Sequence, residues 1–122
     1  MSGIVKVKDG VEFKVIAPGG FVLLAAVVAT AKNLDLDLTL TSACDGTHSG
    51  PDDPHHRGEA YDIRTHDLWD PKRVLDELIS NLEAHDPGRF FAFLEAPGTE
   101  NEHIHCQVRK GTSYPPQKAM SA

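Results

Sequence analysis

The sequence lacks the features that mark several classes of protein. Lysine and arginine never form a cluster longer than a pair, and the formal net charge is −6, so the basic patch of a nucleic-acid-binding protein is missing. The most apolar segment, residues 21–31 (FVLLAAVVATA), has 11 residues, whereas a membrane-spanning helix needs about 20. We therefore expect neither nucleic acid nor a membrane as a partner.

Cysteine is scarce as well. Cys44 and Cys106 are the only cysteines, too few and too far apart for the disulfide framework of a small secreted protein. This pattern favours two partly buried free thiols. Because a polar, charged stretch precedes the apolar segment, the start of the chain does not resemble a secretion signal. We therefore expect a protein that is cytoplasmic as synthesised.

The residues that are present are typical of one globular domain. The chain has 122 residues, of which 40% are hydrophobic and 25% charged, and such values suit a single folded unit. We predict a domain over residues 1–110 and a flexible tail over residues 111–122, where glycine, proline and small polar residues accumulate. We expect the protein to be a monomer.

Apolar periodicity and turn residues predict an α+β fold, with two main helices packed on a mainly antiparallel sheet. Asp9-Gly10 between two alternating runs is the signal of a β-hairpin, and Asp70-Pro71 is a helix start with an N-cap and a proline at the first position. The expected elements are a hairpin over residues 4–16, helices over 21–34 and 71–85, a loop over 44–58, and strands over 36–40, 59–64, 89–94 and 103–109.

Imidazoles and carboxylates gather in the loop and near the last predicted strand. Both are ligand types that suit zinc, and catalytic zinc commonly takes three protein ligands and one water molecule. Periodicity does not separate the two adjacent histidines of the loop. The candidate residues are His48, His55, His56, Asp62, Glu102, His103 and His105.

The last predicted strand divides its residues between two faces. His103 and His105 are two positions apart and share one face, while Ile104 and Cys106 share the other. If Ile104 belongs to the core, both histidines face a cleft. Glu102 can join them only if the strand begins at about His103 and Glu102 lies in the preceding turn.

The strand over residues 59–64 allows a similar division. Asp62 shares a face with Ala60 and Arg64, whereas Tyr61 and Ile63 take the other face and suit the core. The small side chain of Ala60 would leave room for a metal ion or a substrate. Asp62 is therefore a candidate ligand.

Three segments carry a resemblance to a known family: TSACDGTH (41–48), HHRGEAYDIR (55–64) and EHIHC (102–106). They resemble the zinc D-alanyl-D-alanine carboxypeptidases and L-alanyl-D-glutamate endopeptidases, which share their fold with the hedgehog signalling domain. The family pattern is His, two residues, Gly, one residue, Ala, one residue and Asp, with an acidic residue far downstream, shortly before the last zinc histidine. His55, Gly58, Ala60 and Asp62 match this spacing.

The resemblance implies a hedgehog/DD-peptidase-like fold and one zinc ion per chain. By this resemblance the zinc ligands are His55, Asp62 and His105, and Glu102 is the catalytic base. His103 would contact the substrate or the tetrahedral intermediate.

The resemblance also assigns the remaining polar residues. His48 would line the cleft, and His56 would not be a ligand. The upstream segment lacks the arginine that larger dipeptidase members direct toward substrate, and Arg64 would substitute for its charge in binding substrate. A protein of this kind could be phage-encoded and released to the cell wall.

The function implied by the resemblance is that of a zinc metallopeptidase. It would hydrolyse peptide bonds of peptidoglycan-type peptides, as a D-Ala-D-Ala carboxypeptidase or an L-Ala-D-Glu endopeptidase, with Glu102 activating the attacking water. An alternative is a non-catalytic, zinc-stabilised module that binds peptide or cell wall, although such a binder has no need of Glu102. A third reading is metal-dependent phosphoester hydrolysis, which would usually require a second metal or a phosphate clamp.

Overall fold

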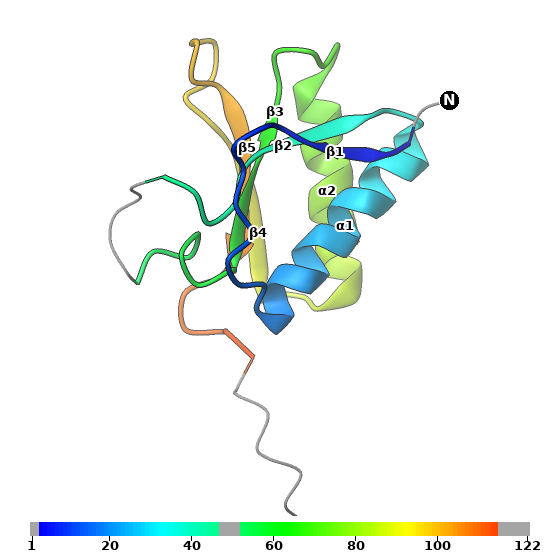
Figure 1. Cartoon of the computed structure of the whole chain (residues 1–122). Coiled ribbons are helices and arrows are strands. Elements are labelled where there is room, and N and C mark those ends of the chain that lie inside the picture. The colour runs from blue at the N-terminus through cyan, green and yellow to red at the C-terminus, as the bar shows by residue number, and fades with distance from the viewer. Residues whose placement is uncertain (1–2, 47–51, 115–122) are drawn as a thin grey trace, which may run out of the picture.

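The computed structural model describes residues 3–46 and 52–114. Two helices pack on one face of a five-stranded sheet with the strand order β1-β2-β3-β5-β4 (Figure 1). The elements are β1 (Val5–Val7), α1 (Pro18–Leu34), β2 (Leu38–Ser42), β3 (Ala60–Arg64), α2 (Pro71–His85), β4 (Phe90–Glu95) and β5 (His103–Val108). Only the β1–β2 pair is parallel among these strands. The predicted α+β fold with a mainly antiparallel sheet is confirmed.

Helix α2 has the predicted bounds because its start is fixed locally. The side chain of Asp70 accepts a hydrogen bond from the backbone N–H of Arg73 (3.2 Å), and Pro71 occupies the first turn. The buried residues Val74, Leu78 and Leu82 recur every four residues, which places them on one side of the helix, against the sheet and α1.

Helix α1 begins three residues earlier than predicted. Pro18, Gly19 and Gly20 form its first turn instead of a separating loop. Both glycines are buried, and a Cβ atom at Gly20 would lie 2.0 Å from the backbone oxygen of Gly58. Lack of a side chain at this position therefore lets the start of α1 lie directly against the loop that precedes β3.

The predicted hairpin over residues 4–16 is wrong. The chain does turn at Asp9-Gly10, where the N–H of Val11 donates to the oxygen of Lys8 (3.2 Å) and Gly10 has a φ of +91°. Residues 11–16, however, form no strand beside β1. Instead, β1 pairs in parallel with β2, with Val5 opposite Leu38.

The segment after this turn pairs with the histidine-rich loop. The N–H of Cys44 donates to the oxygen of Glu12 (2.8 Å), and the N–H of Ala17 donates to the oxygen of Gly58 (3.2 Å). The alternation of apolar and charged residues over 11–16 thus indicates an extended segment, but this segment pairs with the loop before β3 and not with β1.

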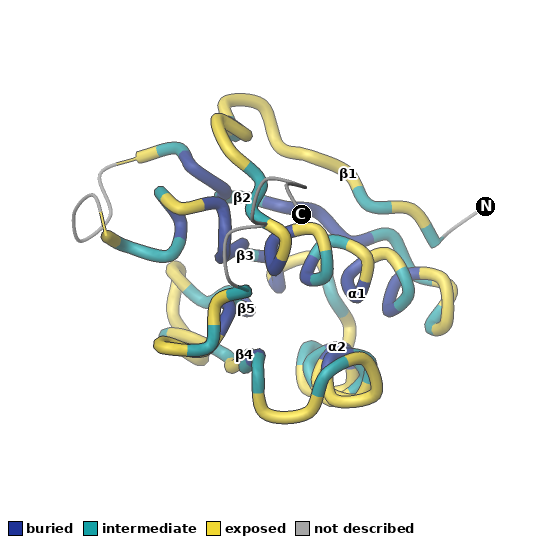
Figure 2. Tube along the Cα trace, turned by 90° about the horizontal axis from the view of Figure 1, so that it is seen from below, coloured by how far each residue is buried: buried dark blue, intermediate teal, exposed yellow. Residues whose placement is uncertain are grey.

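The core lies between the sheet and the two helices (Figure 2). As predicted, Tyr61 and Ile63 of β3 and Ile104 and Cys106 of β5 are buried there. Alternate residues of the same strands are left for the opposite face of the sheet, which the helices do not cover.

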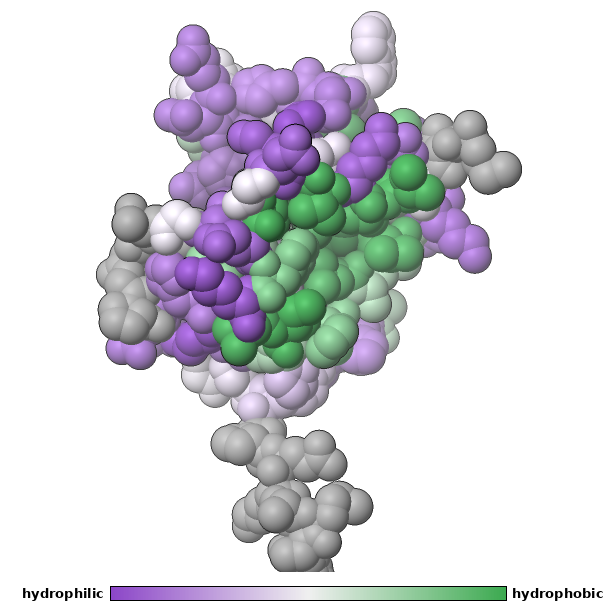
Figure 3. Space-filling view, in the orientation of Figure 1, coloured by the Kyte–Doolittle hydropathy of each residue, from purple (hydrophilic) through white to green (hydrophobic). Residues whose placement is uncertain are grey.

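An apolar surface covers part of the molecule on the side of α1. Figure 3 shows apolar side chains gathered over α1 and the segment before it. The exposed large apolar residues of these two segments include Phe13, Phe21 and Val28. No helix within residues 3–46 and 52–114 has the length and apolar character needed to cross a membrane.

The start of the predicted tail contacts the domain. The hydroxyl of Thr112 donates to the oxygen of Arg89 (3.0 Å), and the hydroxyl of Tyr114 donates to Asp86 (3.1 Å). Residues 115–122 lie outside the described part of the chain.

Candidate metal centre

The three predicted ligands lie together on the sheet face opposite the helices. His55 comes from the loop before β3, Asp62 from β3 and His105 from β5, where Asp62 and His105 are directly opposite each other. One potential ligand atom from each lies within 4.8 Å of the other two. Asp62 Oδ1 is 2.9 Å from His105 Nδ1 and 3.4 Å from His55 Nε2. We call these three residues the candidate metal centre.

The orientation of His55 is fixed by the backbone. Its Nδ1 lies 2.8 Å from the carbonyl oxygen of Ala43. A carbonyl oxygen only accepts hydrogen bonds, so Nδ1 carries the proton and donates it. In the neutral form that binds a metal ion, the Nε2 lone pair of this ring would therefore face Asp62.

His105 is oriented by a side chain. Its Nε2 lies 2.8 Å from Oε1 of Gln107, and the amide nitrogen of Gln107 donates to the oxygen of Val108 (3.1 Å). The second contact turns the amide oxygen of Gln107 toward His105, so that Nε2 carries a proton and Nδ1 faces Asp62. Neighbours of this kind fix the tautomer of metal-binding histidines.

This arrangement makes a prediction about Gln107. Gln107→Leu removes the acceptor for His105 Nε2–H, so the ring can take the wrong tautomer or turn away. We expect zinc affinity to fall about 10- to 100-fold, measured by competition with a chromophoric chelator. Gln107→Glu keeps an acceptor at this position and should retain most of the affinity. Equal affinity of the leucine variant and the unchanged protein would remove Gln107 from the site.

The electrostatics of the metal-free centre follow from its burial and its contacts. Burial raises the pKa of Asp62, but hydrogen bonds from His105 and His55 outweigh this effect and hold the pKa well below its usual value. Burial lowers the pKa of His105, but its bonds to Asp62 and Gln107 outweigh the burial and raise it. A carboxylate thus faces a ring that holds a proton readily. A metal ion binding here would displace that proton.

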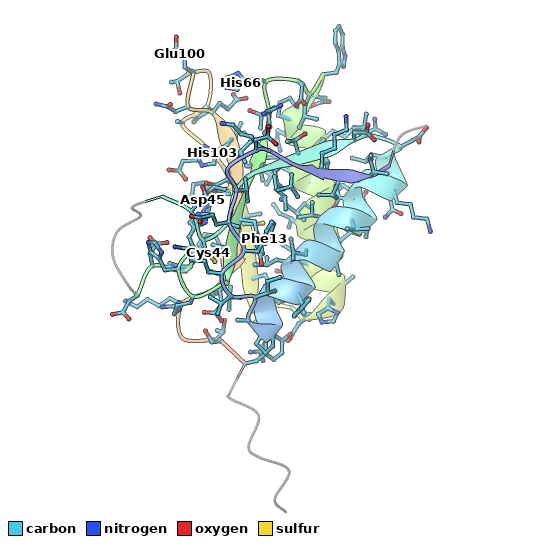
Figure 4. All side chains as sticks on the ribbon, in the orientation of Figure 1. Phe13, Cys44, Asp45, His66, Glu100 and His103 are labelled. Atoms are coloured by element: carbon cyan, nitrogen blue, oxygen red, sulfur yellow. The ribbon has the colours of Figure 1, made fainter. Side chains whose placement is uncertain are left out.

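His103 lies beside the centre on the same face of β5, as predicted (Figure 4). Its Nδ1 is 2.7 Å from the backbone oxygen of Asn101, and its Nε2 is 3.6 Å from Asp62 Oδ1. The same Nε2 lies 3.2 Å from a carboxylate oxygen of Glu95. Glu95, His103 and His105 form a second group whose potential ligand atoms lie within 4.8 Å of one another.

Glu95 is a candidate site residue that sequence reasoning missed. It ends β4, and the β4–β5 register places it opposite His103, with Phe93 opposite His105. The signal in the sequence was the alternation of FFAFLE, which puts Phe91, Phe93 and Glu95 on one face. Only the pairing of β4 with β5 shows that this face is the one with the histidines.

Two phenylalanines form an apolar wall beside the centre. The rings of Phe91 and Phe93 stack with centroids 5.9 Å apart, and the ring of Phe93 lies 5.4 Å from that of His105. Phe93 is 41% exposed, so its ring is available to an apolar part of a ligand.

Glu102 lies in the turn before β5, where the sequence required it, because β5 begins at His103. Its carboxylate accepts hydrogen bonds from the hydroxyl of Thr65 (2.6 Å) and from the N–H of Gly98 (2.8 Å). These bonds lower the pKa of Glu102. Glu102 is not a member of either group of potential ligands among the described residues.

The remaining predicted site residues are Arg64, His56 and His48, and they do not share one location. Arg64 lies opposite His103 and lines a pocket of about 340 Å³ together with Lys8 and His66. Figure 4 shows His66 and Glu100 at one end of this face and Cys44 and Asp45 near the other. His56 is half-buried and outside both groups of potential ligands in the described part of the chain. His48 lies outside the described residues.

Both cysteines are buried free thiols, as the sequence indicated. The sulfur of Cys44 donates to the oxygen of Val15 (3.4 Å). Burial raises the pKa of the Cys106 thiol to about 12, and its side chain lies in the core. Neither thiol belongs to a group of potential metal ligands within residues 3–46 and 52–114.

Comparison of the chain with models of protein families, with curated protein sequences and with solved structures gives no match. The fold and the site together define an α+β domain with a buried His/Asp/His group that could hold a metal ion.

Proposed function

We propose that this protein is a zinc-dependent metallopeptidase of the hedgehog/DD-peptidase fold that cleaves peptidoglycan-type peptides. The observation that carries the proposal is the convergence of His55 Nε2 and His105 Nδ1 on Asp62, with both tautomers fixed by hydrogen bonds. Two neutral imidazoles and one carboxylate fit the donor set of a catalytic zinc ion, which keeps one coordination position open.

A zinc ion held by these residues would supply Lewis-acid polarisation of a peptide carbonyl and would lower the pKa of water. The remaining tasks fall to the chain itself. A carboxylate must take a proton from the attacking water and give it to the leaving amine. His103 would contact the substrate or the tetrahedral intermediate, since its Nε2 lies 3.6 Å from Asp62 Oδ1 of the centre.

The proposed substrate also fits the walls of the site. Arg64 and Lys8 line the pocket beside Asp62 and His103, and their positive charges would attract the carboxylates of peptidoglycan peptides. The Phe91–Phe93 wall would pack against the apolar parts of the peptide. We propose Arg64 as a substrate-binding residue on this basis.

Two carboxylates are candidates for the base. The sequence resemblance indicates Glu102, whose oxygens are held by Thr65 and Gly98. The contacts favour Glu95, because its carboxylate lies 3.2 Å from His103 Nε2 and is a member of the second group with His105. A base with a lowered pKa is also the weaker base, which counts against Glu102.

Paired substitutions distinguish these two carboxylates. Glu95→Gln should lower kcat by about 100- to 10,000-fold, the usual contribution of a general base, while the tightly bound zinc ion is retained. Glu102→Gln should change kcat far less. Steady-state hydrolysis of a muropeptide, with zinc measured by mass spectrometry, checks both. A large loss of kcat in Glu102→Gln alone would assign the base to Glu102.

The proposed activity is tested by digestion of purified peptidoglycan with the zinc-loaded protein, followed by mass spectrometry of the muropeptides. New peptide ends that vanish with a chelator and return with zinc are expected, and their masses identify the scissile bond. Zinc-dependent retention on peptidoglycan without new ends would indicate a binding module instead. A parallel incubation with a model phosphodiester tests phosphoester hydrolysis.

A further inference from the structure

We propose that Glu95 and His103 hold a second divalent metal ion beside the candidate metal centre, with Asp62 as the carboxylate between the two ions. The proposal rests on metal binding by His55, Asp62 and His105 and does not require that the protein hydrolyses peptides. A second ion would occupy Glu95, so the role of Glu95 as a base belongs to the protein with only the first site filled.

His103 is prepared for a metal ion in the same way as His55. In each ring Nδ1 lies against a backbone oxygen, that of Asn101 for His103 (2.7 Å) and that of Ala43 for His55 (2.8 Å). The proton of each neutral ring is thereby placed on Nδ1. Nε2 of His103 then directs its lone pair toward Asp62 (3.6 Å) and Glu95 (3.2 Å).

Asp62 lies between His55 of the first site and His103 of the second. Its Oδ1 lies at nearly the same distance from His55 Nε2 (3.4 Å) as from His103 Nε2 (3.6 Å). A carboxylate has two oxygens and can bind two ions, and paired metal sites hold their ions about 3.5–4 Å apart. Asp62 can therefore complete the second site while it remains a ligand of the first.

His105 cannot complete both sites. Its Nδ1 faces Asp62 and its Nε2 is engaged with Gln107, so a neutral ring offers one lone pair, which the first ion uses. The second ion would have Glu95 and His103 as its own ligands and would share Asp62. Fewer ligands, and the 49% exposed side chain of Glu95, make the second site the weaker one.

Charge also favours a carboxylate beside the imidazole of His103 at the second site. Two divalent ions this close repel each other strongly, so a second ion requires extra negative charge nearby. Glu95 supplies that charge, in addition to Asp62. The ligand set of imidazole and carboxylate suits zinc and other first-row divalent ions.

Zinc binding to the full chain tests this proposal directly. Equilibrium dialysis of the unchanged protein should give two binding steps, rising to about two ions per chain as in other paired sites. Glu95→Gln and His103→Gln should each lose the weak step and keep the tight one. Glu100→Gln, an exposed acid of the neighbouring turn, and His85→Gln, an exposed histidine at the end of α2, should keep both steps.

Saturation of the unchanged protein at one ion, in millimolar zinc, would overturn the proposal. It would also be overturned if Glu95→Gln and His103→Gln retained the weak step, or if either control lost it. Circular dichroism of each variant confirms that it is folded before its zinc content is compared. A protein that is inactive on peptidoglycan but binds two ions would refute the proposed function and leave this inference intact.

Discussion

Replacing His55 with alanine should abolish tight zinc binding, while the same replacement of the adjacent His56 should leave zinc content unchanged. His55 is buried, and its Nε2 faces Asp62 because Nδ1 is held by the oxygen of Ala43. Loss of a residue that merely orients a ligand costs about 10- to 100-fold in metal affinity, so loss of the ligand itself should cost more than about 100-fold.

His56→Ala is a matched control because it removes the same side chain one position along the same loop. Zinc bound after gel filtration, measured by mass spectrometry, and chelator competition give stoichiometry and affinity. Thermal unfolding in the presence of a chelator shows whether either variant disturbs the metal-free fold. Retention of tight zinc by His55→Ala, or equal losses in both variants, would refute the assignment of His55 as a ligand.

Gly58→Ala should strongly destabilise the protein. Gly58 has a φ of +71°, and a Cβ atom there would lie 2.4 Å from the backbone oxygen of Val15. Left-handed backbone costs a residue with a side chain roughly 1–2 kcal/mol, and overpacking typically adds about 1–3 kcal/mol. We expect a loss of about 3 kcal/mol in the free energy of unfolding.

Gly98→Ala separates the two contributions. Gly98 has a similar φ of +79°, but a Cβ atom there would meet nothing within 4 Å, so only the backbone cost applies. Urea unfolding of both variants in the presence of a chelator gives the comparison. Because the N–H of Gly58 donates to the backbone oxygen of His55 (3.2 Å), Gly58→Ala should also weaken zinc binding by displacing His55. Equal destabilisation by the two substitutions would show that the contact with Val15 is relieved without cost.

Sequence patterns predicted those elements whose signals are local. Helix α2 has its N-cap, its first-turn proline and its apolar stripe within one segment, and its bounds were correct. Alternation also assigned the faces of β3 and β5, since a buried Ile104 requires His103 and His105 on the other side. These features follow from side-chain periodicity alone.

Features that depend on pairing between distant segments could not be predicted in this way. The alternation of residues 11–16 does not specify a partner, and the hairpin interpretation chose the wrong one. Glu95 reaches His103 only through the β4–β5 register. His55 differs from His56 through a contact with Ala43, 12 positions away, and no local pattern contains that contact.

The division of β5 into two faces has a consequence for how such a site can change over generations. In HIHCQV the first, third and fifth residues lie at the candidate metal centre, and the second, fourth and sixth, Ile104, Cys106 and Val108, are buried in the core. Substitutions at the first, third and fifth positions of β5 can therefore alter what the centre binds without changing the packing of the core. Insertion of a single residue into β5 would move each set of side chains to the other face of the sheet, and both the candidate metal centre and the core packing would be lost.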